Sequence, residues 1–210
     1  MEEKSLRTII IVLLLVIALF AGFIIVKKYK ESEFKFSYKS VNGEYLIEKV
    51  KFENTTDYYI TISASNRKEP LRIPFRNSPK DLENLYLEDN IKDRVINKHW
   101  IYITQDPETA KETNQGSFIG LMEFGRILGT SRDGIYGINT KSALTKAESN
   151  ETVTIKTCND IDSTTGIIYL KLGDENKVYL ENACVIIQGK DEKGLIMSSE
   201  KFAYHLLGVF

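Results

Sequence analysis

Cysteine, histidine and proline are scarce in this 210-residue chain, which has two cysteines, two histidines and four prolines. The cysteines, Cys158 and Cys184, form no C-x-x-C pair, and the histidines form no H-E-x-x-H motif. The sequence therefore predicts no metal site. Neither G-x-x-x-x-G-K-[ST] nor G-x-G-x-x-G occurs, so we also predict no phosphate-binding loop and no cofactor.

An excess of positive charge is lacking too, since 28 Lys and Arg face 29 Asp and Glu, which gives a net charge of −1. Nucleic-acid-binding domains normally carry a basic stripe that neutralises phosphates, so we do not expect a nucleic-acid partner. The densest basic cluster is Lys27, Lys28 and Lys30, directly after an apolar segment. We interpret these lysines as anchors at a membrane interface.

Only one long uncharged segment is present, residues 8–26, and a helix of this length spans roughly the 30 Å hydrocarbon layer of a bilayer. The absence of a second such segment excludes a multi-pass transporter. The segment is longer than a signal-peptide core and lacks a small-residue cleavage pattern, so we expect it to stay attached. The predicted organisation is a tail (1–7), a transmembrane helix (8–26), a juxtamembrane linker (27–33) and a globular domain (34–210).

The orientation of this membrane helix follows from two patterns that disagree. The lysines after the segment slightly outnumber the basic residues before it, which favours a cytoplasmic domain. A disulfide between Cys158 and Cys184 suits an oxidising compartment, with two separate buried thiols as the alternative. We predict the disulfide and a domain outside the cytoplasm. Two glycosylation sequons, at Asn54 and Asn150, are about as many as chance predicts, so they leave glycosylation undecided.

The first part of the domain, residues 34–75, shows the alternation of apolar and polar residues that is typical of β-strands. Asn42-Gly43 predicts a tight hairpin turn. Pro74 has no N–H to donate, so its strand should lie at a sheet edge. These patterns predict a β-meander with one buried face.

The rest of the domain mixes helical and strand patterns. Residues 117–128 are mostly apolar and predict a buried helix, and residues 194–207 predict an amphipathic helix capped by Gly208. Residues 166–172 and 177–180 flank a turn at 173–176 and predict a hairpin. We therefore predict an α+β domain with a mixed β-sheet and about three helices.

Two charges interrupt the apolar helix, Glu123 and Arg126, spaced so that they face each other. They predict a buried ion pair, because buried charges are usually paired. The alternative is a ligand site in which Arg126 binds a carboxylate or phosphate with two hydrogen bonds. No triad or nucleophile motif accompanies them, so no catalytic residue is predicted.

Four segments carry a resemblance to known proteins: WIYITQDPETA from residue 100, FIGLMEFGRILGT from 118, VYLENACVIIQG from 178 and EKFAYHLLGVF from 200. In these segments, and in its single anchor, the chain resembles an uncharacterised family of small archaeal membrane-anchored proteins. The resemblance covers roughly the last half of the domain. It implies one anchor, one α+β domain and a matched cysteine pair, and it implies no activity.

Three functions fit these patterns. The preferred one is a membrane-tethered, non-enzymatic domain that contacts lipid through residues 8–26 and binds a protein or envelope component. The second is an envelope-associated, hydrolase-like enzyme that uses dispersed acidic residues and Arg126. The third, a pilin-like structural subunit, is disfavoured because the residue pattern around a pilin cleavage site is missing.

Overall fold

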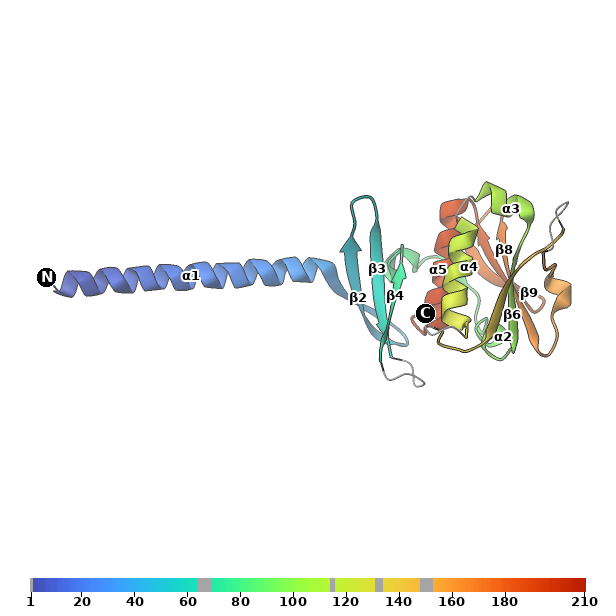
Figure 1. Ribbon diagram of the computed structural model, residues 1–210, viewed down its shortest axis with the longest axis horizontal. Coiled ribbons are helices and arrows are strands. Elements are labelled where there is room, and N and C mark those ends of the chain that lie inside the picture. Colours follow the sequence, from blue (N-terminus) through green and yellow to red (C-terminus); the bar gives the residue numbers. More distant parts are fainter. Residues whose placement is uncertain (1, 64–68, 114–115, 131–133, 148–152) are drawn as a thin grey trace.

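The computed structural model describes residues 2–63, 69–113, 116–130, 134–147 and 153–210, with side chains left undescribed at 2–10 and 28–33. Beyond a long N-terminal helix, the chain forms three layers (Figure 1). A four-stranded sheet and a six-stranded sheet enclose a layer of two helices. The predicted α+β class with a mixed sheet is confirmed. There are two sheets instead of one, because the central helices are apolar on two faces and each face needs a covering sheet.

The N-terminal helix α1 (Glu2–Phe34) projects away from the four-stranded sheet (Figure 1). It continues through residues 2–7 and 27–33, which we expected to be a tail and a linker, because no Pro or Gly interrupts either segment. Its side chains at 11–27 are all exposed. Among the residues that the structure describes, no helix is long and apolar enough to cross a membrane. The predicted helix over 8–26 is thus confirmed as a helix only.

The four-stranded sheet is an antiparallel meander of β1 (Lys35–Ser40), β2 (Gly43–Lys51), β3 (Thr56–Ile62) and β4 (Leu71–Phe75). The turn at Asn42-Gly43 is confirmed, since Ser40 pairs with Gly43 across it. Pro74 lies on the edge strand β4, as its missing N–H requires.

The inner face of this meander carries Ile47, Ile60 and Ile73, which are fully or almost fully buried. Its outer connections are exposed. Asn54 lies in the turn between β2 and β3, where its side chain is accessible, whereas Asn150 lies outside the described residues.

The six-stranded sheet has the strand order β5-β9-β10-β8-β6-β7, in which β7, β6, β8 and β10 run parallel to one another. Strand β9 is antiparallel to β10 and parallel to β5. The strands are β5 (Tyr86–Leu87), β6 (Trp100–Gln105), β7 (Asn139–Leu144), β8 (Thr165–Leu172), β9 (Lys177–Glu181) and β10 (Cys184–Gly189).

The predicted hairpin between residues 166–172 and 177–180 is wrong. The strands β8 and β9 do form, but β10 lies between them. The true hairpin joins β9 to β10 through Asn182, whose φ of 58° is a left-handed conformation that asparagine tolerates. Burial explains the arrangement, because the mostly apolar strand β10 is buried along its whole length and pairs with a strand on each side.

The helices are more numerous than the three expected. Helices α4 (Gly116–Leu128) and α5 (Glu192–Leu206) match the predicted pair. The additional ones are α2 (Asp93–Ile96), α3 (Pro107–Glu112) and two 3₁₀ turns, η1 (Pro79–Leu82) and η2 (Cys158–Asp160). Three of them, η1, α3 and η2, begin at a side-chain cap, and η1 and α3 also have proline in the first turn, whereas α2 has no side-chain cap.

Helix α5 lies at the centre of the domain, between the two sheets. Tyr204 stacks on Phe75 of β4 with ring centroids 4.0 Å apart, and Phe202 meets Phe124 of α4 at 5.7 Å. Helix α5 ends at Leu206, and Gly208 follows it with a φ of 82°. The N–H group of the next residue, Val209, donates to the C=O group of Tyr204, which completes the predicted cap. Because both faces of α5 are covered, even polar residues of this helix are buried, among them Glu200.

Candidate functional site

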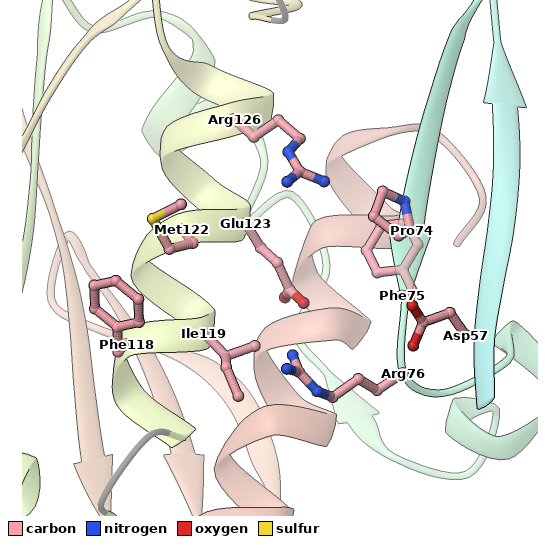
Figure 2. A pocket seen from close by; sticks show the side chains of 9 residues that line it. All are labelled: Asp57, Pro74, Phe75, Arg76, Phe118, Ile119, Met122, Glu123 and Arg126. Carbon is pink, nitrogen blue, oxygen red and sulfur yellow. The ribbon is translucent and has the colours of Figure 1, made fainter. Parts of the chain in front are cut away.

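A cavity of about 340 Å³ opens between helix α4 and the edge of the four-stranded sheet (Figure 2). Strand β3 and the end of β4 form one wall, and one face of α4 forms the other. The residues that line it are Asp57, Pro74, Phe75, Arg76, Phe118, Ile119, Met122, Glu123 and Arg126. Both predicted residues of α4, Glu123 and Arg126, therefore belong to one cavity.

Glycine at position 120 fixes how closely the two central helices approach. A Cβ atom on Gly120 would lie 2.7 Å from the hydroxyl oxygen of Ser199 on α5, so the helices pack here only without a side chain. One turn further along, this close approach brings Glu123 of α4 next to Glu200 of α5, and the two carboxyl groups interact. The sheet wall adds Arg76, which directly follows β4.

Glu200 is fully buried and lies behind the cavity wall. Its carboxyl oxygens accept hydrogen bonds from Arg76 N at 2.5 Å, from Asn77 N at 2.9 Å and from Asn77 Nδ2 at 2.6 Å. Burial dominates over these donors and raises the pKa of Glu200 to about 7. The carboxyl group thus ties the loop after β4 to helix α5.

Glu123 is buried within the cavity wall, with 9% of its surface exposed. Burial, and next the negative charge of Glu200, raise its pKa well above the ordinary value, against the pull of Arg76 and Arg126. Both influences favour the protonated, neutral form of Glu123. Its Oε2 atom is buried and has no hydrogen-bond partner among the described residues, which is uncommon for a native polar group.

Two arginines approach Glu123 from different layers of the fold. Figure 2 shows the guanidinium groups of Arg76 and Arg126 on opposite sides of the Glu123 carboxyl group. Arg76 is exposed and Arg126 is half-buried. Among the described residues, neither arginine has a carboxylate within ion-pair distance. The two alternatives for Glu123 and Arg126, a structural pair and a ligand site, both stay predictions.

The mouth of the cavity is apolar. Phe118 and Met122 lie one turn apart on the outer side of α4, with 60% and 53% of their surfaces exposed. Large apolar side chains that are exposed beside a charged cavity are typical of contact surfaces. Arg126 follows Met122 by four residues, so an apolar stripe on α4 leads to a cation.

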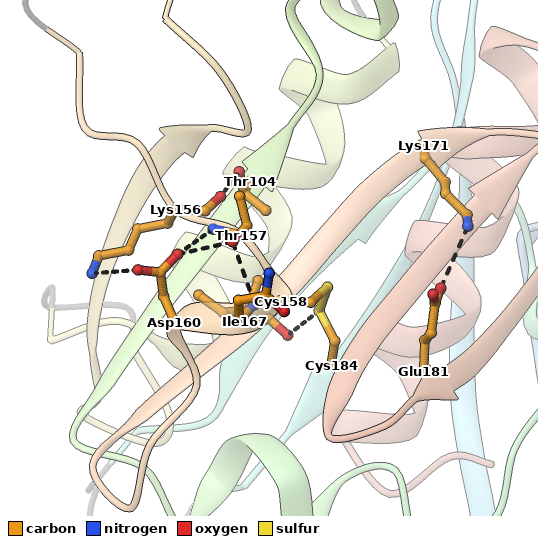
Figure 3. The surroundings of a disulfide bond; sticks show 10 residues. Thr104, Lys156, Thr157, Cys158, Asp160, Ile167, Lys171, Glu181 and Cys184 are labelled. Atoms are coloured by element: carbon orange, nitrogen blue, oxygen red, sulfur yellow. Dashed lines mark hydrogen bonds and ion pairs between the residues drawn. A yellow bond between two sulfur atoms is a disulfide. The ribbon is translucent and has the colours of Figure 1, made fainter.

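The predicted disulfide between Cys158 and Cys184 is confirmed, with Cα atoms 5.4 Å apart (Figure 3). It joins the turn η2 to the first residue of β10, on the face of the six-stranded sheet opposite the helices. Asp160 caps the same turn by accepting hydrogen bonds from Thr157, and Lys156 pairs with Asp160 at 3.5 Å. The bond is far from the cavity and fastens a loop over the second face of the sheet.

The remaining predicted residues lie outside the cavity. Lys27 is exposed on α1, while the side chains of Lys28 and Lys30 lie outside the description. His205, which the sequence does not single out, is half-buried and donates a hydrogen bond from Nδ1 to the main-chain oxygen of Phe210, 2.8 Å away. In the described parts of the chain, no group of three or more His, Cys, Asp or Glu residues is placed to hold a metal ion.

Three residues of the site have no counterpart in the sequence analysis: Asp57, Arg76 and Glu200. Each comes from a different element, and only the packing of the meander on the helices brings them together. Comparisons of the chain with models of protein families, with curated proteins and with solved structures gave no match.

Proposed function

We propose that the chain is a membrane-tethered binding domain, outside the cytoplasm, whose cavity between β4 and α4 holds an anionic group of its partner. The observation that carries the proposal is the pair of guanidinium groups of Arg76 and Arg126, unpaired among the described residues and directed at one cavity. Guanidinium groups bind carboxylates and phosphates through paired hydrogen bonds. The partner is then a protein or an envelope component that carries such a group.

The tether in this proposal is the apolar segment 8–26. All side chains of α1 from residue 11 to 27 are exposed, including eleven consecutive uncharged positions from Ile11 to Ala21. A row of exposed aliphatic side chains on a free-standing helix is unfavourable in water and favourable in lipid. The disulfide supports an oxidising location for the domain.

An envelope-associated hydrolase remains the second candidate, favoured by the raised pKa of Glu123 beside Arg126. Hydrolysis by paired carboxyl groups needs a second acid at the reacting atoms. Glu200 does not line the cavity and is held by Arg76 and Asn77, so Asp57 on the strand wall is the second acid there. We favour binding over hydrolysis because the two arginines that line the same cavity have no ion-pair partner among the described residues.

Anion binding is tested with the full chain in detergent micelles, by calorimetric titration of hexanoate and of hexyl phosphate. We expect at least one of the two anions to bind, and Arg126→Ala and Arg76→Ala each to weaken binding by about tenfold or more. The matched control is Arg72→Ala, since Arg72 lies on β4, just before Arg76, but pairs with Glu48 at 3.0 Å and does not line the cavity. Binding of neither anion, or equal loss in Arg72→Ala, contradicts the proposal.

The location of the domain is tested by labelling intact cells with a membrane-impermeant maleimide. Val41 is 99% exposed in the β1–β2 turn, and the native cysteines are bonded, so Val41→Cys supplies one accessible thiol. We expect Val41→Cys to be labelled in intact cells. Ser5→Cys, on the other side of residues 8–26, is the control and should react only after lysis. The reverse pattern places the domain in the cytoplasm.

A further inference from the structure

We propose that the ligand of the cavity is an apolar monocarboxylate, in which one carboxylate is attached to a compact apolar group. This inference rests on the proposed function and names the chemical class that the cavity selects. Two sources supply this chemistry, the C-terminal residue of a peptide and a short free acid, and the experiment below separates them.

The charges that line the cavity favour a single negative charge on the ligand. Its wall carries two cations, Arg76 and Arg126, and two acids, Asp57 and Glu123. Burial favours the neutral form of Glu123, and with Glu123 neutral the wall has two positive charges and one negative charge, a net of +1. A monoanion neutralises this charge, whereas a phosphate dianion adds an excess negative charge beside Asp57.

The hydrogen-bonding groups fit a carboxylate as well. A neutral carboxyl group has one O–H donor, which a second carboxylate accepts. Glu123 has a buried oxygen atom without a partner, and the guanidinium groups lie on either side of it (Figure 2). A ligand carboxylate placed there receives a hydrogen bond from Glu123 and two charge-assisted hydrogen bonds from an arginine. The unsatisfied group is thereby explained as a binding group.

The apolar part of the ligand is indicated by the rest of the lining. Pro74, Phe75 and Ile119 form the inner apolar wall. Phe118 and Met122 continue it to the surface as exposed side chains on α4. A ligand whose carboxylate lies at Arg126 therefore places its apolar group along the stripe of α4 that precedes this residue. The volume of about 340 Å³ fits a compact group and lies near the lower end for small-molecule sites.

The test compares four probes on the full chain in detergent micelles: N-acetyl-leucine, its uncharged amide, hexanoate and hexyl phosphate. We expect both carboxylates to bind and the amide to bind at least about tenfold more weakly, because it lacks the charge that the arginines recognise. Tighter binding of N-acetyl-leucine than of hexanoate assigns the peptide terminus as the source, and the reverse order assigns a free acid. Hexyl phosphate should bind more weakly than either.

Four variants separate recognition of the carboxylate from recognition of the apolar group, with acetate added as a carboxylate that has almost no apolar group. Met122→Ala should weaken the binding of N-acetyl-leucine and hexanoate severalfold and leave the binding of acetate unchanged, whereas Arg126→Ala should weaken the binding of all three. Glu123→Gln keeps a hydrogen-bond donor and should retain binding, whereas Glu123→Leu should lose it, with the unfolding midpoint of each variant as the check on folding. Equal or tighter binding of hexyl phosphate, or equal binding of the amide, overturns this inference and leaves the proposed anion site intact. Failure of every anion overturns both.

Discussion

The free energy of unfolding is expected to fall by about 3 kcal/mol as the pH rises from 4.5 to 7.5, because Glu200 must lose its proton inside the folded domain. Its pKa is about 7 in the fold, against an ordinary value of 4.5. Below pH 4.5 both states hold the proton. Between the two values only the folded state holds it, so stability decreases across this window and changes little above it. Glu123 acts in the same direction, since its pKa is also raised.

The measurement is urea unfolding of the full chain at several pH values, followed by the fluorescence of Trp100, the only tryptophan. Glu200→Gln removes the titrating group, so the stability of this variant relative to the native chain should rise by about 3 kcal/mol over the same window. Glu53→Gln is the control, since Glu53 lies exposed in the β2–β3 turn. Parallel profiles of stability against pH for Glu200→Gln and the native chain would show that burial does not raise the pKa of Glu200.

The elements that the sequence predicts correctly are those governed by local chemistry. The hairpin at Asn42-Gly43, the edge position of Pro74 and the cap at Gly208 each follow from one residue's backbone preferences. Helix α4 follows from a run of apolar residues with helical periodicity. These features depend on a few neighbouring residues, so a single sequence contains enough information to place them.

The features that the sequence does not predict depend on packing between layers. Residues 198–201 of α5 are polar, as a solvated segment would be, but all four are buried. Ser198 contacts β10, Ser199 lies against α4 and Glu200 binds the loop after β4, so neighbours from three elements surround them. The order of β8, β9 and β10 likewise depends on tertiary structure, because β10 is buried along its whole length and lies between the other two strands. Glu123 and Arg126 can be predicted together because they lie three residues apart on one helix. Arg76 and Glu200 are far away in the sequence, and only the tertiary fold brings them to the same place.

Removing the disulfide with Cys158→Ala and Cys184→Ala together is expected to lower the free energy of unfolding by about 3–4 kcal/mol. The bond closes a loop with a sequence separation of 26 residues, and this loop contains both β8 and β9. In the chain-entropy account, the cross-link stabilises the fold mainly by restricting the unfolded chain. Cys184 is also fully buried, so its truncation adds a small packing loss.

Reduction of the native chain separates these two contributions, because it breaks the bond and leaves both sulfur atoms in place. We expect reduction to account for most of the loss and to have no effect on the double variant. A native chain that is equally stable when oxidised and reduced would show that other contacts restrict the loop sufficiently. Those contacts are the cap formed by Thr157 and Asp160 and the hydrogen bond from Thr104 Oγ1 to Lys156 O, 2.7 Å long.

The urea dependence of stability distinguishes an effect on the unfolded chain from an effect on the folded loop. A cross-linked unfolded chain exposes less surface, so the slope of free energy against urea should be larger in the double variant than in the native chain. If the disulfide acted only by holding η2 on the sheet, the slope would stay constant while the midpoint fell. We expect both the steeper slope and the lower midpoint, because the 26-residue separation makes the unfolded chain the state that the bond restricts most.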